Sequence, residues 1–217
     1  MDRYTLNVIN NSTQNGNFCV FQENPDITDP YVMSLAWFNK YAFPKTKLSF
    51  NWTIDYGFVW SQTGRLTKGV IFNASQDFPA NLKSTNQITI SKEQGAYYFH
   101  DQRRGPKEGT LYIEEDNTIP SNQVSVGISM SGKGTFAVQG QPNMSALFTP
   151  HPKYYVVFGN FIDGEVLDVT KISNKFEIDF PPNVYSVTAV FNPDNTWSMM
   201  TTEKYNSQII AKEEAVH

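Results

Sequence analysis

The stretch that decides the fold class of this chain is LSFNWTIDYGFVW, residues 48–60. Large apolar side chains occupy every second position of it, and small or polar side chains occupy most of the positions between. Because successive side chains of a strand point to opposite faces of a sheet, the pattern predicts one long strand over residues 48–60 with one buried face. Aromatic side chains can bury about 150–250 Å² each, so a second layer must cover that face.

The rest of the chain repeats short apolar segments separated by turn signals, which is typical of an all-β antiparallel sandwich with jelly-roll or Greek-key connections. Four antiparallel pairs are expected: 4–8 with 18–21 as an opening hairpin, 48–60 with 66–72, 88–90 with 96–100, and 124–130 with 136–138. The segment 32–38 fits either a strand or one helical turn. We expect a single domain over residues 1–200, with 117–123 as the candidate internal division, and a helical or disordered tail over 201–217.

The charge balance and the length of the apolar runs argue against several classes of protein. The 217 residues carry 17 basic and 21 acidic side chains, a formal net charge of −4. A nucleic-acid-binding protein usually concentrates basic charge, so no nucleic acid is expected as a partner. No apolar run approaches the roughly 20 residues that span a bilayer as a helix. The N-terminus lacks the pattern of a secretory signal, which predicts a cytoplasmic protein, with export by a route without a cleaved signal as the alternative.

Motifs for metal, cofactor or covalent chemistry are weak throughout the sequence. Cys19 is the single cysteine, so no intrachain disulfide can form and a structural role is expected for it. The three histidines lie too far apart for a zinc pattern. Residues 127–134, GISMSGKG, nearly spell a phosphate-binding loop, but a glycine follows the lysine where that motif needs Ser or Thr. The acidic groups at 114–116 and 163–168 lack the spacing of a calcium loop and fit solvated turns. We therefore expect no metal, no cofactor and no catalytic residue.

The candidate ligand-binding residues lie in and just after the segment 96–100. They combine aromatic, titratable and basic groups: Tyr98, His100, Asp101, Arg103 and Arg104. An imidazole beside a carboxylate could serve as an acid–base pair, with the arginines holding an anion. The alternative is a strand end followed by a solvated loop, and it is favoured because neighbouring strand residues point to opposite faces.

The high aromatic content bears on both the core and the surface. Four tryptophans and eleven tyrosines contribute to an aromatic fraction of 14%. Core packing is the leading account for most of these side chains. Exposed rings beside Asn and Asp are also used by sugar-binding sites, because rings stack on the apolar faces of sugars, and by proteins that bind membrane surfaces.

Several segments resemble the RhiA family, first known from rhizosphere-expressed proteins of rhizobia. The resemblance rests on NNS at 10–12, FCVFQ at 18–22, SLAWF at 34–38, FNW at 50–52, DYGFVW at 55–60, TG at 63–64, ASQ at 74–76, VTAVF at 187–191 and DNTW at 194–197. It implies a bacterial accessory protein, associated with life near or on hosts and with expression controlled by cell density, rather than a metabolic enzyme. No activity, cofactor or catalytic set comes with the family, so the resemblance implies no site residue.

These observations favour a non-enzymatic binding protein that acts at a host surface or the cell exterior, with a glycan as the first ligand to test. The alternative is a membrane-active or toxin-like β protein, with peripheral contact rather than a spanning helix, in which residues 124–138 form a membrane-active hairpin. An enzyme would require a deep pocket that contains His100 with Asp101 or an arginine. A self-assembling role would require an unprotected edge strand. The sequence leaves the oligomeric state open.

Overall fold

The structure is a computed structural model that describes residues 2–23 and 31–215. Within those ranges the chain forms seventeen strands and one helix. Their bounds are β1 Arg3–Asn10, β2 Gly16–Glu23, β3 Met33–Ser34, β4 Ala36–Ala42, β5 Lys47–Thr53, β6 Tyr56–Ser61, β7 Gln76–Ala80, β8 Gln87–Glu93, β9 Ala96–Arg103, β10 Leu111–Glu115, β11 Ser125–Met130, β12 Lys133–Gln139, β13 Met144–Phe148, β14 Lys153–Phe158, β15 Phe176–Ile178, β16 Ser186–Phe191, β17 Trp197–Thr201 and α1 Thr202–Glu214.

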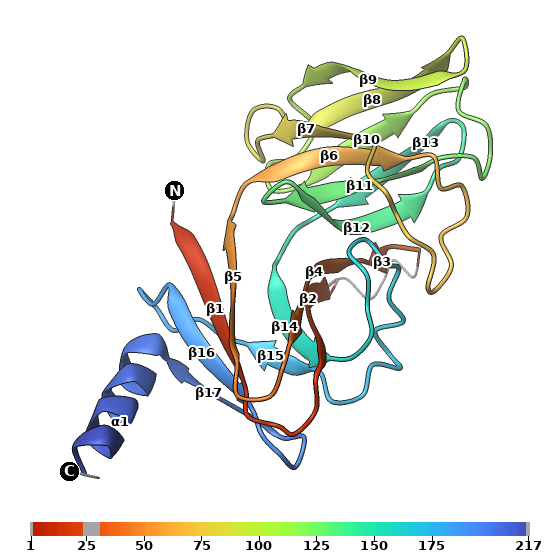
Figure 1. The fold of residues 1–217 in the computed structure, drawn as a ribbon. Coiled ribbons are helices and arrows are strands. Elements are labelled where there is room, and N and C mark those ends of the chain that lie inside the picture. The colour runs from red at the N-terminus through yellow and green to blue at the C-terminus, as the bar shows by residue number, and fades with distance from the viewer. Residues whose placement is uncertain (1, 24–30, 216–217) are drawn as a thin grey trace.

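Four sheets stack in pairs to form two sandwiches (Figure 1). The first sandwich contains the sheets β17-β16-β1-β5 and β15-β14-β2-β4, and the second contains β3-β12-β11-β6-β7 and β13-β10-β8-β9. Each sandwich has its own apolar core, to which both of its sheets contribute. Most strand pairs are antiparallel, although β1 with β16 and β8 with β10 are parallel. The all-β, sandwich-like fold expected from the sequence is therefore confirmed.

The predicted long strand over residues 48–60 is two strands, and each belongs to a different sandwich. The even positions stay apolar throughout, but Phe50 and Trp52 enter the first core whereas Phe58 and Trp60 enter the second. A bend at residues 54–55 separates β5 from β6. Polar contacts fix this bend, because the Thr53 hydroxyl binds the Asp55 carboxylate and the Ser131 amide donates to the Asp55 carbonyl oxygen at 3.2 Å. The alternation correctly predicted which face is buried. It could not reveal that the first half of this face packs in one core and the second half in the other.

Two of the four expected strand pairs are wrong. β1 pairs with β5 and β16, and β2 pairs with β4 and β14, so the predicted opening hairpin is divided between two sheets. The segment 66–72 does not pair with β6, which lies between β7 and β11. Instead, Leu66 and Phe72 pack in a small cluster with Leu35 and Val59. The β8–β9 and β11–β12 hairpins are confirmed. The segment 32–38 is extended and not helical, with residues 33–34 in β3 and 36–38 in β4.

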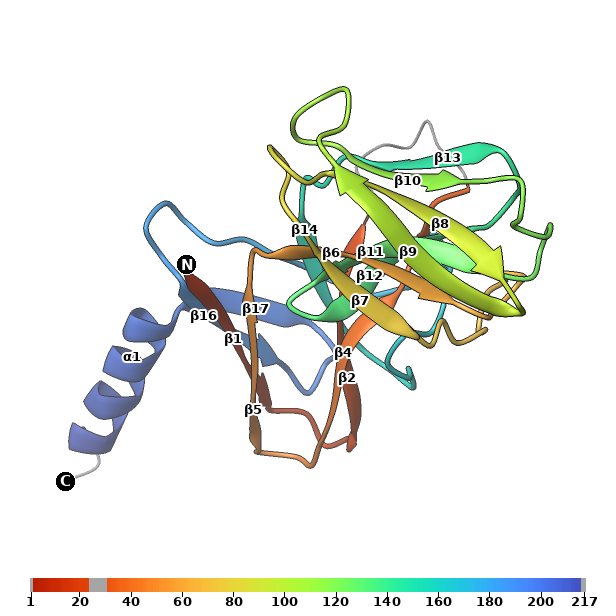
Figure 2. The same cartoon turned by 90° about the horizontal axis from the view of Figure 1, so that it is seen from above.

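The second sandwich is built almost entirely from one continuous part of the chain, β6 to β13, with β3 added at one edge. The first sandwich combines strands from both ends of the chain. The chain passes between them at residues 54–55 and 149–152, and also on either side of β3, which lies between β2 and β4 of the first sandwich in the sequence. Residues 117–123, in contrast, connect β10 to β11 inside the second sandwich. Viewed from above, β8 and β9 cross over the sheet that contains β6 and β11 (Figure 2).

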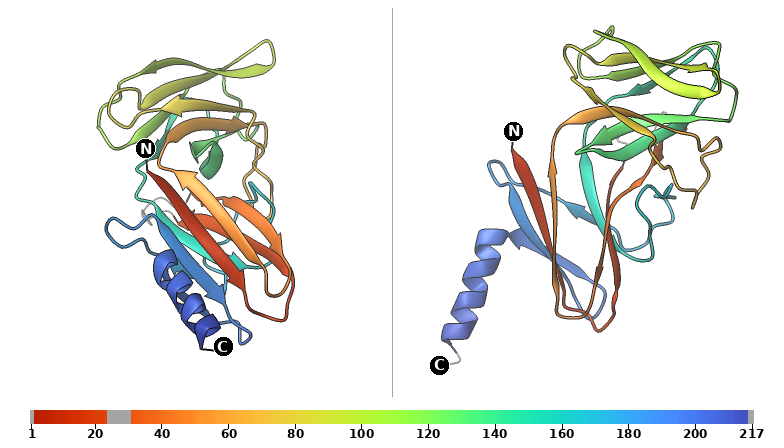
Figure 3. Two further views of the ribbon diagram at one scale, coloured as in Figure 1. Left: turned by 60° about the vertical axis from the view of Figure 1, so that its left-hand side comes forward. Right: turned by 45° about the horizontal axis from the view of Figure 1, so that its top comes forward.

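The tail forms the helix α1, which extends beyond the end of β17 (Figure 3). Thr201 caps its N-terminus by accepting a hydrogen bond from the Lys204 amide at 3.2 Å. None of the residues of α1 is buried. Within residues 2–23 and 31–215, no helix is both long and apolar enough to cross a membrane.

The tryptophans belong largely to the two cores. Trp37 and Trp52 are fully buried in the first core, and Trp60 is buried in the second. Trp197 is partly buried, and its ring stacks on Phe176 with the centroids 5.8 Å apart. Any binding of a ligand by exposed aromatic rings must therefore involve tyrosine or phenylalanine side chains.

Candidate functional site

The candidate site lies on the side of the β13-β10-β8-β9 sheet that faces away from the second core. Alternate residues of these strands, such as Ile88, Ile90 and Phe99, point into that core. The residues between them point outward and are mainly polar. We call this surface the outer face and define it by the following residues: Thr89, Ser91, Tyr98, His100, Asp101, Arg103, Glu114, Asp116 and Ser145.

A β-bulge brings His100 and Asp101 together. The register of β9 against β8 shifts between Gln87 and Thr89, and Asp101 adopts a φ of +50° at this point. Its carboxylate oxygen Oδ2 consequently lies 2.9 Å from His100 Nδ1. The expectation that these neighbours point to opposite faces is wrong here, because a bulge interrupts the alternation of a strand.

The Ser91 hydroxyl connects this pair to a second carboxylate. Its Oγ lies 2.6 Å from His100 Nε2 and 2.5 Å from Asp116 Oδ2. Burial acts to raise the pKa of Asp116, but hydrogen bonds from Ser91 and Thr118 and the nearby His100 outweigh that effect and lower the pKa. Asp116 is thus a carboxylate that can only accept, so Ser91 donates to it and accepts from the imidazole.

This direction of hydrogen bonding decides what the cluster can do chemically. Ser91, His100 and Asp101 have the connectivity of a hydrolase triad. The single proton of the Ser91 hydroxyl is directed at Asp116, however, and the residue is 4% exposed. A nucleophilic serine must pass its proton to the imidazole and reach the substrate. The network therefore fixes the orientation of the His100 ring without activating Ser91.

Tyr98 lies beside the His100 ring, and Arg103 binds Thr89, the residue of β8 that pairs with His100. Tyr98 is 39% exposed, and the centroid of its ring lies 5.1 Å from that of His100. The Arg103 guanidinium donates to the Asp101 carbonyl oxygen at 2.9 Å and to Thr89 Oγ1 at 3.2 Å. Two partly exposed rings and one oriented cation are therefore held side by side.

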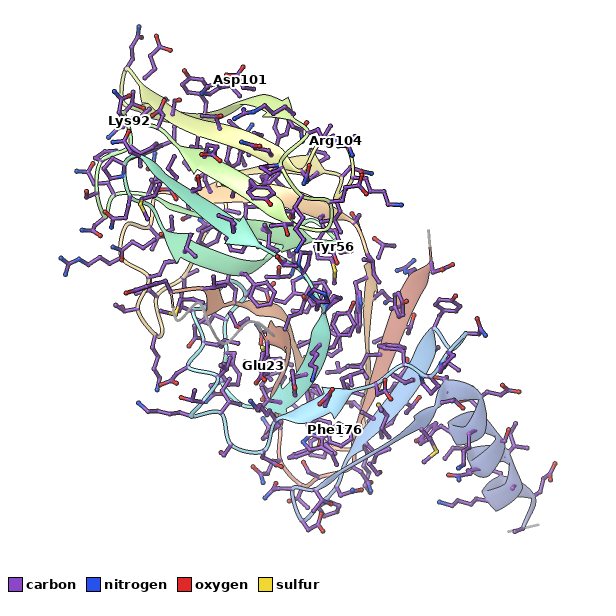
Figure 4. All side chains as sticks on the ribbon, turned by 180° about the vertical axis from the view of Figure 1, so that it is seen from behind. Glu23, Tyr56, Lys92, Asp101, Arg104 and Phe176 are labelled. Atoms are coloured by element: carbon purple, nitrogen blue, oxygen red, sulfur yellow. The ribbon has the colours of Figure 1, made fainter. Side chains whose placement is uncertain are left out.

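Arg104, the fifth predicted residue, binds elsewhere. Its guanidinium pairs with Glu108 at 2.7 Å, in the loop that follows β9, and both side chains are largely exposed. Asp101 and Arg104 are labelled at separate positions near the outer end of the second sandwich in Figure 4. The structure therefore brings four of the five predicted residues together and leaves Arg104 in an ion pair of its own.

Two acidic residues of the outer face, Glu114 and Asp116, were not predicted from the sequence. Glu114 accepts from Ser145 at 2.6 Å and from Gln87 at 3.2 Å, and Asp116 accepts from Ser91. Both belong to the run 114–116, which was interpreted as a solvated turn, whereas 114 and 115 lie in β10. In the described ranges, no group of three or more His, Cys, Asp or Glu side chains could hold a metal ion.

The proposed membrane-active hairpin, residues 124–138, lies within a sheet. All six residues of β11 are buried, and β11 is flanked by β6 and β12. Exposed aromatic side chains occur instead beside the turn between β4 and β5. Tyr41 and Phe43 are 51% and 62% exposed, with ring centroids 5.4 Å apart. Lys45 in this turn and Lys47 at the start of β5 are also exposed.

Comparisons with known proteins agree on one family. The family model RhiA matches residues 1–202. The protein RhiA of Rhizobium leguminosarum bv. viciae is 36% identical over 202 residues, which cover 91% of this chain and 86% of that protein. No solved structure matches the chain. The resemblance noted in the sequence is confirmed.

Proposed function

Since the chain belongs to the RhiA family, we propose that it is a non-enzymatic bacterial accessory protein that acts at a host surface or the cell exterior by binding a glycan on the outer face. The observation that carries this proposal is the exposed ring of Tyr98 beside the His100 ring, within a network of fixed polar groups. The absence of an activated nucleophile at Ser91 favours binding over hydrolysis.

A sugar ring presents an apolar face and a rim of hydroxyl groups, and both have counterparts here. The apolar face of the sugar stacks on Tyr98. Pairs of aromatic rings gain about 0.5–1.5 kcal/mol beyond the burial of area, and we take the same range for a sugar stacked on a ring. The hydroxyl groups reach acceptors on Asp101 and Glu114 and the donor on Arg103. Because hydrogen bonds to neighbouring side chains and to the Asp101 carbonyl oxygen already orient these groups, little conformational entropy is lost on binding.

The test is a glycan array with labelled protein, followed by titration calorimetry on the glycans that bind, with and without calcium. We expect Tyr98→Ala to weaken binding by roughly threefold to tenfold, which corresponds to one lost stack. Tyr98→Phe should retain binding because it keeps the ring. Tyr185→Ala is the matched control, since Tyr185 is 40% exposed and lies outside the outer face. No binding across the array, or equal losses in Tyr98→Ala and Tyr185→Ala, would count against the proposal.

A second candidate function is contact with an anionic membrane surface through the β4–β5 turn. Exposed aromatic rings next to lysines are suited to the headgroup region of a bilayer, where rings enter the interface and cations meet anionic lipids. Tyr41, Phe43, Lys45 and Lys47 provide this combination. Co-sedimentation with phosphatidylserine vesicles should fall in Phe43→Ala, and dye leakage from the same vesicles separates surface contact from membrane disruption. Equal sedimentation of Phe43→Ala and the unsubstituted chain would reject this candidate.

A further inference from the structure

The second sandwich contains a pocket of about 890 Å³ between its two sheets. Its lining residues come from the edge strand β13 and the end of β10 on one side and from β3, β11 and β12 of the opposite sheet on the other. Apolar side chains from both sheets form most of the wall, including Ile128, Phe136 and Val138 on one side and Met144, Ala146 and Phe148 on the other. A pocket of this size and composition can enclose a small apolar molecule.

One acidic side chain interrupts this apolar wall. Glu115 is the last residue of β10. Its side chain points to the same, inward side of the sheet as those of Leu111 and Ile113, and it is 4% exposed. In the described part of the chain, Glu115 is the only charged residue that lines the pocket, and Tyr31 is the other titratable one. The carboxylate oxygen Oε2 accepts a hydrogen bond from the Gln141 amide.

No cation of the described residues forms an ion pair with Glu115. Burial raises the pKa of Glu115 to about 7, although the hydrogen bond from the Gln141 amide acts in the opposite direction. A buried carboxylate without a cationic partner is costly, and a positive charge delivered by a ligand would offset that cost. An anionic ligand would instead meet a like charge in an apolar setting.

We propose that this pocket binds a hydrophobic primary amine, with the hydrocarbon chain between the two sheets and the ammonium group on Glu115. Oε2 is already bonded to Gln141, so Oε1 is the acceptor for the ligand. Glu115 is separate from the ligand groups of the outer face, because β10 directs Glu114 to one side of the sheet and Glu115 to the other, although Ser145 at the edge strand β13 borders both. The amine site can therefore exist whether or not the outer face binds a glycan.

The test compares three ligands of equal chain length, octylamine, octanol and octanoate, by titration calorimetry on the full chain. Octylamine should bind more tightly than octanol, and octanoate should bind least tightly. Because the carboxylate form is required, octylamine binding should be about tenfold tighter at about pH 8 than at about pH 6. Near pH 7, binding should release about half a proton per amine, measured in buffers that differ in ionisation enthalpy.

Two variants assign the effect to Glu115. Glu115→Gln keeps the size of the side chain and an acceptor for the Gln141 amide, so it should bind octanol as before while losing the preference for octylamine and its pH dependence. Glu93→Gln, in the exposed part of β8, is the matched control and should change neither. Octylamine bound no better than octanol, an amine affinity that is equal at both pH values, or a preference that survives Glu115→Gln would each overturn the proposal.

Discussion

Replacing Glu115 by Gln should change the free energy of unfolding more favourably at alkaline pH than at acidic pH, when the variant is compared with the unsubstituted chain. Burial raises the pKa of this carboxyl from 4.5 to about 7 in the folded chain. The folded state therefore holds a proton that the unfolded state has lost, so the stability of the unsubstituted protein falls as the pH rises between these two values. The full difference is about 3 kcal/mol, of which roughly 2–3 kcal/mol falls between pH 5 and pH 8.

The assay is urea unfolding of Glu115→Gln and of the unsubstituted chain at about pH 5 and about pH 8. Any cost of burying the neutral amide is the same at both pH values, so the change in the difference between the two proteins reports the carboxyl alone. Glu93→Gln controls for the removal of a charge at an exposed position. If Glu115→Gln and the unsubstituted chain respond to pH in parallel, Glu115 is not a buried acid without a cationic partner, and this result would count against the amine site.

Three further predictions concern other positions. Burial raises the pKa of the Cys19 thiol, so a thiol reagent at about pH 8 should leave the folded chain unmodified and react in denaturant; rapid reaction of the folded chain would contradict this. The pKa of Asp116 is lowered on folding, so its stabilisation is present above the ordinary value of 3.8 and is lost as the pH falls through the lowered value. Asp116→Asn should accordingly cost more stability in urea at about pH 7 than at about pH 3, and equal costs would reject the network around it. Gly127→Ala directs a methyl group at the Phe136 carbonyl oxygen and should lower the free energy of unfolding by roughly 1–3 kcal/mol, whereas an unchanged urea midpoint would mean that β11 and β12 can separate at no cost.

The elements predicted correctly from the sequence are those whose geometry is local. The β8–β9 and β11–β12 hairpins turn at residues 94–95 and 131–132, and all four of these residues have positive φ. A two-residue turn of this kind forces the flanking strands to pair, so the residues of the turn and of the two strands are enough to predict the hairpin. The opening segments are joined by a longer polar loop and obey no such constraint. Their partners are β5, β16, β4 and β14, most of them distant in the sequence, which local alternation cannot identify.

The same limit applies to the site. The sequence identified His100 and Asp101 as neighbours with suitable chemistry, but regular alternation separates them, and only the bulge in β9 brings them together. Ser91 and Asp116, which hold the other side of the imidazole, come from β8 and from the residue after β10. No spacing rule connects residues 91, 100 and 116, because their proximity follows from the order of strands in the sheet.

Glu115 is a different case, because the sequence did contain a usable signal. Leu111 and Ile113 are large and apolar, so the same alternation directs residue 115 into the core and residue 114 away from it. The acidic run 114–116 concealed this pattern, since three successive acids are ordinarily solvated. Two adjacent glutamates thus have opposite environments: Glu114 is bonded to Ser145 on the outer face, and Glu115 lines an apolar pocket. The difference between them follows from strand alternation alone, and it is why the two proposed ligands, a glycan and an amine, can be tested independently by substitutions on opposite sides of one sheet.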